Sequence, residues 1–358
     1  MDRKHVILIT GAAGYVGAML VEQFAKRPDV ERIIGIDKEP MPENFKHEPK
    51  LVYLSINTAD RWEEQVRGYH PNIVIHTAWQ IREMYGDKKT EWEWNVTGSD
   101  KVFDFAFAEK SVERLVYFST VSSYGAFPDN SLTHRYTEDE PFRKSEYLYA
   151  EEKRIVEEHL KERYEKSDKH VAVSIVRPAA ITGPRGRYMR IRFGLQSSLS
   201  GTLKGQGSLV YDLISLWVSW VPVTPLWLRQ YIHEDDVVGI VDRLAFGEKV
   251  EGYEVFNICP PGPVVLGPDM AKAVGKRMLP IYPWMVRLAF FWVWHLTRGK
   301  IPTSRGSWRG YSYPIAVDGS KVTRVLGYHY THSGPDAFQY TDGAYEEYVP
   351  ENLRRHRA

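Results

Sequence analysis

An alternation of short apolar segments with helical patterns runs through the first 177 residues and constrains the fold more than any other feature of the sequence. The apolar, β-branched segments predict strands at 5–10, 32–36, 51–54, 72–76, 114–119 and 170–177, and the helical patterns fall at 16–27, 61–68, 91–109 and 146–165. Strand, helix, strand at this spacing is typical of a parallel sheet covered by helices on both faces. We therefore expect an α/β fold with a doubly wound parallel sheet of the Rossmann type.

The regular pattern weakens beyond residue 177, where glycines and prolines interrupt a polar and then aromatic region. A helix at 235–246 and a strand at 253–258 resume the pattern. Open α/β sheets bind their ligands at the carboxyl ends of the strands, so a second, smaller domain is expected over that edge. The expected domains are a dinucleotide-binding domain at 1–177, with contributions from about 229–258, and an irregular substrate-binding cap at 178–228 and 259–340.

The composition excludes several classes of protein. The chain has 358 residues, 47 Lys+Arg against 46 Asp+Glu, and 43% hydrophobic residues, which is unlike a disordered protein. The near-neutral charge gives no support for nucleic-acid binding, which needs a basic face. The single Cys259 cannot form an intrachain disulfide, and the apolar run at 6–9 is too short for a signal peptide. A reducing, cytoplasmic location is therefore expected.

Two apolar segments in the C-terminal half are rich in tryptophan. Residues 209–228 and 279–296 are interrupted by prolines and charges, so neither is expected to span a membrane. Three interpretations stay open for their aromatic side chains: they form core, line a pocket for a hydrophobic substrate, or make peripheral contact with a membrane. The six tryptophans in question are Trp217, Trp220, Trp227, Trp284, Trp292 and Trp294.

A glycine-rich segment, Thr10-Gly11-Ala12-Ala13-Gly14-Tyr15-Val16-Gly17, follows the first expected strand and precedes a helix. Glycines here allow a tight turn and let backbone N–H groups approach a pyrophosphate at the helix N-terminus. Asp37 stands twenty residues further on, at the end of the second strand. A carboxylate there accepts hydrogen bonds from a ribose diol and repels a 2′-phosphate, which favours NAD over NADP. The adjacent Lys38 can weaken this preference for NAD. The alternative interpretation is that Asp37 is only a turn residue.

Tyr149 and Lys153 lie four residues apart, on one face of the expected helix at 146–165. The pair alone is weak evidence, because Tyr85 and Lys89 have the same spacing. Only the first pair follows a strand that ends in a cluster of hydroxyl residues, Ser119-Thr120-Val121-Ser122-Ser123. A nearby ammonium and a positively charged nicotinamide ring both favour the phenolate form of a tyrosine, so Tyr149 can act as the acid/base while a hydride is transferred.

In this order and spacing, the motifs resemble the extended short-chain dehydrogenase/reductases of the NAD-dependent epimerase/dehydratase family. The motifs that carry the resemblance are Gly11, Gly14 and Gly17; Asp37; His76-Thr77-Ala78; Asn95-Val96-Thr97-Gly98; Ser119-Thr120 with Tyr124-Gly125; Tyr149 and Lys153; Arg177-Pro178 with Gly183-Pro184; Arg229 to Asp236; and Asp318 to Lys321 with Leu326-Gly327-Tyr328. The resemblance also implies a homodimer through the helices at 91–109 and 146–165.

The resemblance implies catalytic roles for Asn95, Thr120, Tyr149 and Lys153. The expected cofactor-binding residues are Gly11, Ala13, Gly14, Tyr15, Val16, Gly17, Asp37, Lys38, Ser55, Ile56, His76, Thr77, Ala78, Asn95, Ser119, Tyr149, Lys153, Arg177, Pro178 and Ala180. The expected substrate contacts are Trp79, Thr120, Ser122, Tyr149, Arg187 and Arg229. No metal is expected.

The sequence departs from the family pattern where substrate is bound. Nucleotide-sugar epimerases usually have Asn at the position of Ala180 and Gly-Asp-Gly at residues 224–228. Sugar-nucleotide 4,6-dehydratases have Asp-Glu directly after the catalytic Thr, whereas Val121-Ser122 follow here, so dehydration is not expected. Four arginines of the expected cap are candidates for binding a phosphate or carboxylate: Arg185, Arg187, Arg190 and Arg192. The alternative is that they form a solvated face.

The expected function is that of an NAD-dependent oxidoreductase of the epimerase/dehydratase type. It would act on a hydroxyl or keto group of a sugar or sugar-nucleotide-like substrate, with Tyr149 transferring the proton and NAD the hydride. The alternative is a 3β-hydroxysteroid dehydrogenase-like or other alcohol dehydrogenase or ketone reductase with a hydrophobic substrate. A third class, a non-enzymatic NAD sensor or scaffold, is disfavoured because Thr120, Tyr149 and Lys153 are all present.

Overall fold

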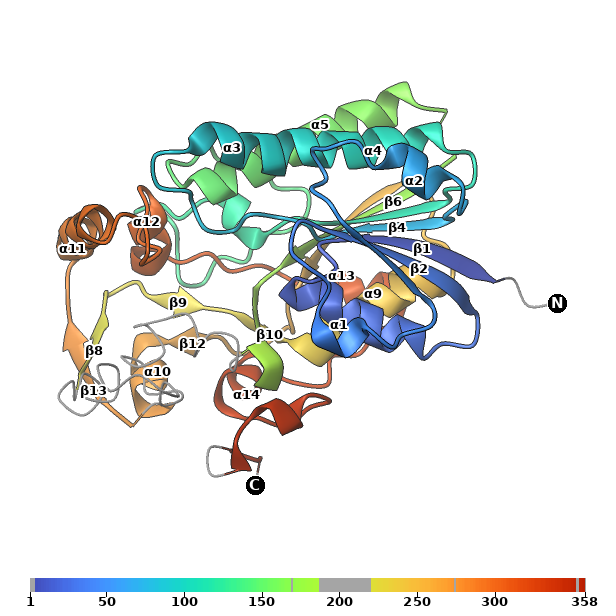
Figure 1. The fold of residues 1–358 in the computed structure, drawn as a ribbon. Coiled ribbons are helices and arrows are strands. Elements are labelled where there is room, and N and C mark those ends of the chain that lie inside the picture. Colours follow the sequence, from blue (N-terminus) through green and yellow to red (C-terminus); the bar gives the residue numbers. More distant parts are fainter. Residues whose placement is uncertain (1–3, 169, 187–219, 274, 352–353, 358) are drawn as a thin grey trace. The chain divides into compact units, whose positions relative to one another are not determined.

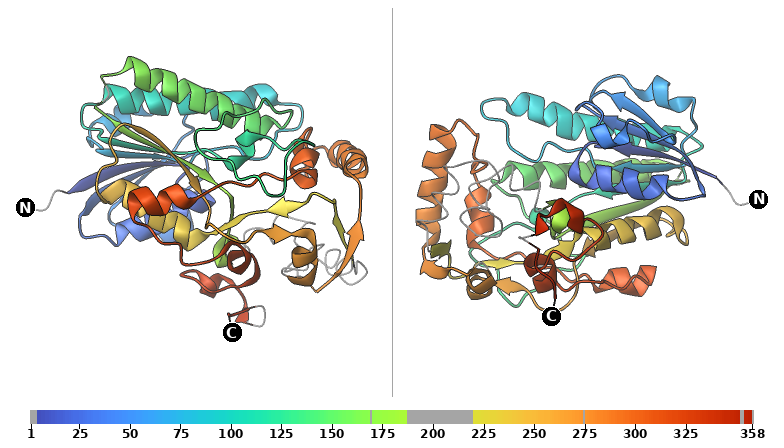
Figure 2. Two further views of the ribbon diagram at one scale, coloured as in Figure 1. Left: turned by 180° about the vertical axis from the view of Figure 1, so that it is seen from behind. Right: turned by 60° about the horizontal axis from the view of Figure 1, so that its bottom comes forward.

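The computed structural model describes residues 4–168, 170–186, 220–273, 275–351 and 354–357 (Figures 1 and 2). Two compact units make up the chain. Unit 1 contains Met1–Thr120, Glu151–Arg177 and Val238–Phe256, and unit 2 contains Val121–Ala150, Pro178–Val237 and Asn257–Ala358.

A seven-stranded sheet in the order β11-β6-β5-β4-β1-β2-β3 organises unit 1. Its strands are β1 (His5–Thr10), β2 (Val30–Asp37), β3 (Leu51–Ser55), β4 (Ile73–His76), β5 (Arg114–Phe118), β6 (Ala172–Pro178) and β11 (Tyr253–Ile258). The pairings from β3 through β6 are parallel, and Thr10 is in register with Ile36 on one side and His76 on the other. The carboxyl ends of β1, β2 and β4 therefore meet at one edge. The predicted doubly wound parallel sheet is confirmed.

Helices cover both faces of this sheet (Figure 1). One face carries α2 (Glu63–Arg67), α3 (Lys88–Trp92), α4 (Gly98–Ala108) and α5 (Leu148–Lys166), and the other carries α1 (Tyr15–Ala25) and α9 (Glu234–Phe246). The strands are apolar runs because both faces are buried: Ile7, Leu8 and Ile9 of β1 have no exposed surface. Burial of each such side chain stabilises the fold by about 1.5–3 kcal/mol.

The helix predicted at 91–109 is divided in the structure. α3 ends at Trp92, a π-helical turn spans Glu93–Thr97, and α4 begins at Gly98. Gly98 packs closely on the neighbouring loop, since a Cβ there would lie 2.5 Å from Thr58 Oγ1. The extra residue of the π turn places Asn95 inward, where it is 1% exposed. Such insertions often occur at functional sites.

Unit 2 is built from short strand pairs and short helices. Its strands are β7 (Ala180–Thr182), β8 (Trp220–Val223), β9 (Leu228–Arg229), β10 (Tyr231–His233), β12 (Val265–Leu266) and β13 (Arg277–Pro280). β7 pairs with β10 and β8 with β13 in parallel, and β9 pairs with β12 antiparallel. Its helices are α10 (Gly267–Ala273), α11 (Pro283–Leu296), α12 (Ser307–Ser312), α13 (Ser320–Leu326) and α14 (Gly334–Gln339). Single 3₁₀ turns lie at Val121–Tyr124 and Glu346–Tyr348 of unit 2, and at Glu43–Phe45 of unit 1.

The tryptophans of the C-terminal half divide between core and surface. Trp227 packs with Val221, Tyr231 and their neighbours in the core of unit 2, and Trp294 is also buried. Trp220, Trp284 and Trp292 are more than half exposed, and Trp217 lies outside the described residues. Of the five tryptophans that the structure describes here, Trp227 and Trp294 therefore belong to the core. Among the described residues, no helix is long and apolar enough to cross a membrane.

Candidate active site

The glycine loop between β1 and α1 leaves no room for a side chain at Gly11 or at Gly17. Gly11 has a φ of +73°, and a Cβ on it would lie 2.6 Å from the backbone N of Ala78. A Cβ on Gly17 would lie 2.0 Å from the Gly11 carbonyl oxygen. Gly14 caps α1 without a side-chain hydrogen bond, and the first turn of that helix has no acidic residue. The loop thus leaves backbone N–H donors and a positive helix end for a pyrophosphate.

Asp37 ends β2 directly beside this loop. Its Oδ2 accepts a hydrogen bond from the Ala13 N–H at 3.0 Å, and its Oδ1 accepts one from the Glu39 N–H at 3.0 Å. The ammonium of Lys38 forms an ion pair with Glu39 rather than with Asp37. The carboxylate of Asp37 therefore lies at the strand tip beside the glycine loop, with Lys38 paired elsewhere.

A cavity of about 350 Å³ lies beside the ends of β2 and β3. Three of the predicted cofactor-binding residues, Lys38, Ser55 and Ile56, line it together with Asn57, Ala59, Asp60, Glu93 and Trp94. The ammonium of Lys38 lies 5.0 Å from the Trp94 ring centroid. A cavity of this size, with one flat aromatic wall, is suited to a nucleoside.

His76 connects the ends of β1 and β4 inside unit 1. Its Nδ1 lies 2.6 Å from Thr10 Oγ1 and its Nε2 lies 2.8 Å from Ser99 Oγ. Thr77 Oγ1 donates to the Thr10 carbonyl at 2.7 Å, which holds the next residues against the glycine loop. Burial, and secondarily the charge of Lys153, lowers the pKa of His76 to about 3. His76 is therefore a neutral structural link between strand ends.

We predict that this buried histidine makes stability fall in mild acid. Between about pH 6.5 and 3 the unfolded chain binds a proton at His76 and the folded chain does not, so the free energy of unfolding falls with falling pH by up to about 1.4 kcal/mol per pH unit. Above pH 6.5 this contribution is constant. Urea unfolding across this pH range measures the slope. His76→Gln should reduce it and His47→Gln, at an exposed site, should not; equal slopes in both variants would contradict the prediction.

Lys153 is buried beneath the carboxyl end of β5. It is 3% exposed, its Nζ donates to the Phe118 carbonyl, and it lies 3.6 Å from the Trp79 ring centroid. Burial lowers the pKa of Lys153 well below its usual value, while Glu157 and Glu152 act in the opposite direction. The carbonyl and the aromatic face fix this ammonium in one position.

Tyr149 lies on α5 one turn before Lys153, so the two side chains share a face of the helix. The predicted hydroxyl residues Ser119 and Thr120 directly follow β5 and are 3% and 4% exposed. Ser119 Oγ is buried and has no hydrogen-bond partner among the described residues. It thus offers a buried hydrogen-bonding group at the strand end where a cofactor is expected.

The side chain of Asn95 forms hydrogen bonds with two neighbouring segments. Its Oδ1 accepts from the Gln80 N–H at 2.7 Å, and its Nδ2 donates to the Gln80 carbonyl at 3.1 Å and to Glu152 Oε2 at 2.7 Å. Asn95 thereby ties the loop after β4 to α5. Glu152, which is 1% exposed, was not predicted as a site residue. In the sequence it is distinguished only as a carboxylate next to Lys153 within a charged helix.

Arg177 forms a buried ion pair with Glu157 of α5. Its Nη2 lies 2.7 Å from Glu157 Oε2, and its Nε also donates to this carboxylate. A guanidinium and a carboxylate held in this forked geometry stabilise each other when buried, and loss of either partner leaves an uncompensated charge. The pair joins β6 to α5, so a cofactor role for Arg177 stays a prediction.

Tyr15 and Val16 begin α1 of unit 1, and the remaining predicted residues lie in unit 2 or outside the described part. Pro178 ends β6, Ala180 begins β7, Ser122 lies in the 3₁₀ turn at Val121–Tyr124, and Arg229 ends β9. Arg185 is buried, and its backbone N–H donates to Glu234 Oε1 at 2.9 Å. Arg187, Arg190 and Arg192 lie outside the described residues.

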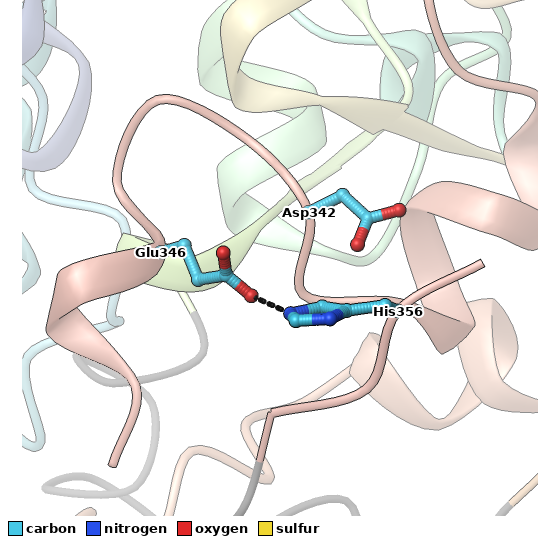
Figure 3. A group of neighbouring side chains, drawn as sticks. All are labelled: Asp342, Glu346 and His356. Carbon is cyan, nitrogen blue, oxygen red and sulfur yellow. Dashed lines mark hydrogen bonds and ion pairs between the residues drawn. The ribbon is translucent and has the colours of Figure 1, made fainter. Parts of the chain in front are cut away.

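A group of potential metal ligands occurs near the C-terminus of the described chain. Ligand atoms of Asp342, Glu346 and His356 lie within 4.8 Å of one another (Figure 3). Glu346 forms an ion pair with His356, and Asp342 forms one with Arg357 at 2.9 Å. Both carboxylates already have partners, Arg357 and His356, and His356 is mostly exposed, so we assign no metal to this group.

Comparison with known proteins identifies the family. A family model described as the NAD dependent epimerase/dehydratase family matches residues 7–259. The chain belongs to this family. The match covers the glycine loop, Asp37, and the Tyr149 and Lys153 pair, so the resemblance inferred from the motifs is confirmed.

Three proteins similar to this chain have low sequence identity to it. An uncharacterized protein of Mycobacterium tuberculosis is 24% identical over 342 residues, 93% of this chain and 82% of the relative. The N-acetyl-alpha-D-glucosaminyl-diphospho-ditrans,octacis-undecaprenol 4-epimerase of Escherichia coli O157:H7 is 24% identical over 185 residues, 51% of this chain and 50% of that protein. A solved complex of Thermus thermophilus UDP-glucose 4-epimerase with NAD matches with a TM-score of 0.64 and 18% identity, covering 93% of this chain and 96% of that one. This likeness shows the shared fold.

Proposed function

We propose that this chain is an NAD-dependent oxidoreductase of the epimerase type that acts on a hydroxyl or keto group of a sugar linked to a diphosphate. The observation that carries the proposal is the fixed position of Lys153, one helical turn from Tyr149 and hydrogen-bonded to the carbonyl that ends β5. In the proposed site, this ammonium, the phenol of Tyr149 and the hydroxyls after β5 act together at the carboxyl end of the strand, where an open α/β sheet binds its ligand.

The residues of unit 1 fit a dinucleotide. The glycine loop and the uncapped start of α1 would hold the pyrophosphate, Asp37 the adenosine ribose, and the cavity at Lys38, Ser55 and Ile56 the adenine. Bound there, NAD would take up a hydride from the substrate carbon and, in an epimerase, return it to the opposite face of that carbon.

Side chains of the protein itself carry out the proton transfer. The Tyr149 hydroxyl, once deprotonated, removes the proton from the substrate hydroxyl, and the ammonium of Lys153 stabilises the phenolate. Thr120 donates a hydrogen bond to the reacting oxygen and fixes its direction. In the return step Tyr149 gives the proton back.

The comparisons favour a sugar diphosphate as the substrate class. The substrate named for the Escherichia coli relative and that of the Thermus thermophilus enzyme both carry a sugar on a diphosphate. Ala180 and residues 224–228 depart from the usual nucleotide-sugar pattern, so the group beyond the diphosphate stays open. A homodimer through α4 and α5 and a cytoplasmic location, with Cys259 reduced, are further parts of this proposal.

The test is a substrate screen on the purified protein. Absorbance first shows whether NAD is tightly bound, and the protein is then offered NAD with UDP- and dTDP-sugars and with hydroxysteroids. Interconversion of sugars without net NADH, followed by NMR, supports the proposal. Accumulation of NADH with apolar alcohols and no sugar conversion would refute the epimerase and support the dehydrogenase alternative.

We predict that Asp37→Asn lowers the preference for NAD over NADP about tenfold. The variant keeps an oxygen that accepts the Ala13 N–H but loses the charge that strengthens the ribose hydrogen bonds and repels a 2′-phosphate. Calorimetric titration with both dinucleotides measures the ratio. Glu31→Gln, at an exposed site of the same strand, serves as the control, and an unchanged ratio in Asp37→Asn would assign Asp37 a turn role only.

A further inference from the structure

α11 is apolar on both of its faces, yet only one face is buried. Val286 and Trp294 are buried, and Phe290 packs against Tyr311 of α12 with ring centroids 6.0 Å apart. The opposite side carries large side chains that are between 51% and 78% exposed. These six residues, the α11 face, are Tyr282, Trp284, Leu288, Phe291, Trp292 and Leu296.

The strand pair of β8 and β13 also exposes apolar side chains. β13 leads directly into α11, and all four of its residues are exposed, among them Met278 and Leu279. Arg277 of β13 is in register with Trp220 of β8, which is 51% exposed. Single exposed apolar residues are ordinary, but three exposed tryptophans and a tyrosine on elements adjoining in sequence or in register are typical of an interaction site.

The charge of this region is strongly one-sided. Residues 270–317 contain eight Lys+Arg and no Asp or Glu, in a chain whose totals are 47 and 46. Two of the eight, Arg305 and Arg309, are paired with Glu146 from another part of the chain. Arg277, Arg287, Arg298 and Lys300 are exposed in or beside the α11 face. A surface that combines apolar aromatic side chains with positive charge complements a layer of anionic headgroups above hydrocarbon.

The length of α11 determines how it would meet a bilayer. Fourteen residues form a helix of about 21 Å, shorter than the hydrocarbon core of about 30 Å. Trp and Tyr side chains prefer the interface between headgroups and hydrocarbon. A helix of this kind lies in the plane of the interface rather than across the membrane.

We propose that the α11 face docks on an anionic phospholipid bilayer, with α11 parallel to the surface and its cations among the headgroups. A symmetric contact between two copies of this chain is disfavoured by the same observations. Such a contact would bring each cluster of cations against its own copy, with no acidic residue between 270 and 317 to balance it.

Vesicle flotation of the full chain tests the proposal without cofactor or substrate, so its result is independent of the proposed function. Wild type should float with vesicles of equal parts phosphatidylcholine and phosphatidylglycerol. Binding to phosphatidylcholine alone should be at least about tenfold weaker, because the headgroup attraction is lost. Absence of flotation with the anionic vesicles, or equal binding to both kinds, would overturn the proposal.

Matched triple variants assign the binding to the α11 face. Trp284→Gln/Leu288→Gln/Trp292→Gln should reduce binding at least about tenfold, because each change removes exposed apolar area from the interface. Tyr69→Gln/Trp92→Gln/Val325→Gln alters exposed apolar side chains elsewhere and should bind like wild type. All six side chains are exposed, so both variants should keep the thermal unfolding midpoint. If the first triple variant floats like wild type, the α11 face is not the docking surface.

Sedimentation in the absence of vesicles distinguishes a second copy as the occupant. Self-association that the first triple variant abolishes, together with no flotation of wild type, would assign the face to an oligomer and overturn membrane docking. Arg298→Glu/Lys300→Glu provides a second arm that leaves the apolar surface intact. It should weaken binding to anionic vesicles at least about tenfold, and unchanged binding in this variant would refute the electrostatic part.

Discussion

Tyr149→Phe is expected to lower turnover by about 10²–10⁴-fold while NAD affinity changes little. Removal of the phenol oxygen eliminates the group that exchanges a proton with the substrate, and general acid/base catalysis contributes about this factor. The ring that remains is nearly the same size, so α5 and the buried Lys153 should keep their positions. A loss of turnover without a loss of binding would identify a chemical rather than a structural role.

Tyr147→Phe is the matched control for this experiment. Tyr147 lies two residues earlier, with its ring centroid 5.6 Å from that of Tyr149, and is likewise half-buried. The same single-atom deletion there should leave turnover within about twofold of wild type. Initial rates on the substrate found in the screen and calorimetric titration with NAD measure the two effects separately. Full activity of Tyr149→Phe would refute the proposed mechanism.

Gly17→Ala is expected to destabilise unit 1 by about 2 kcal/mol or more and to weaken NAD binding at least about tenfold. The new Cβ would lie 2.0 Å from the Gly11 carbonyl oxygen and 3.0 Å from Thr77 Oγ1. The first of these atoms belongs to the backbone, so the loop itself must shift. Any shift moves the N–H groups at the start of α1 away from the pyrophosphate.

Gly68→Ala provides the control for the glycine loop. Gly68 ends α2 with a φ of −62°, and nothing lies within 4 Å of the position its Cβ would take. Its replacement should therefore change the free energy of unfolding by less than about 1 kcal/mol. Urea unfolding and titration with NAD give both quantities. Equal stability of the two variants would show that the close approach at Gly17 is not required.

Some parts of this protein were predicted from sequence because the pattern is local. The strands of unit 1 were placed within a few residues, since a strand buried on both faces needs a continuous apolar run. The glycine loop was found because its spacing follows a strand and precedes a helix. The division of the helix at 91–109 was not predicted, because a π turn has no local sequence pattern comparable to the strand and glycine-loop patterns.

The contacts of the charged side chains depended on the tertiary structure. Asn95, Glu152 and Gln80 are far apart in sequence and meet only because α5 packs beside the loop after β4. The ion pair of Arg177 with Glu157 was not predicted, and the expected cofactor role of Arg177 stays a prediction. A single sequence shows which residues carry charge but not which partners satisfy them, because ion pairs form between elements that are remote along the chain.

The sequence by itself determined the α/β class, the glycine loop, Asp37, and the spacing of Tyr149 and Lys153, because each depends on residues close together in the chain. Only the tertiary structure decided how the tryptophans are used. Trp227 and Trp294 are buried, whereas Trp220, Trp284 and Trp292 are exposed. The hydropathy of a tryptophan is the same in both settings, and its burial depends on whether another element packs over it. The α11 face is exposed because the described part of unit 2 covers only one side of that helix.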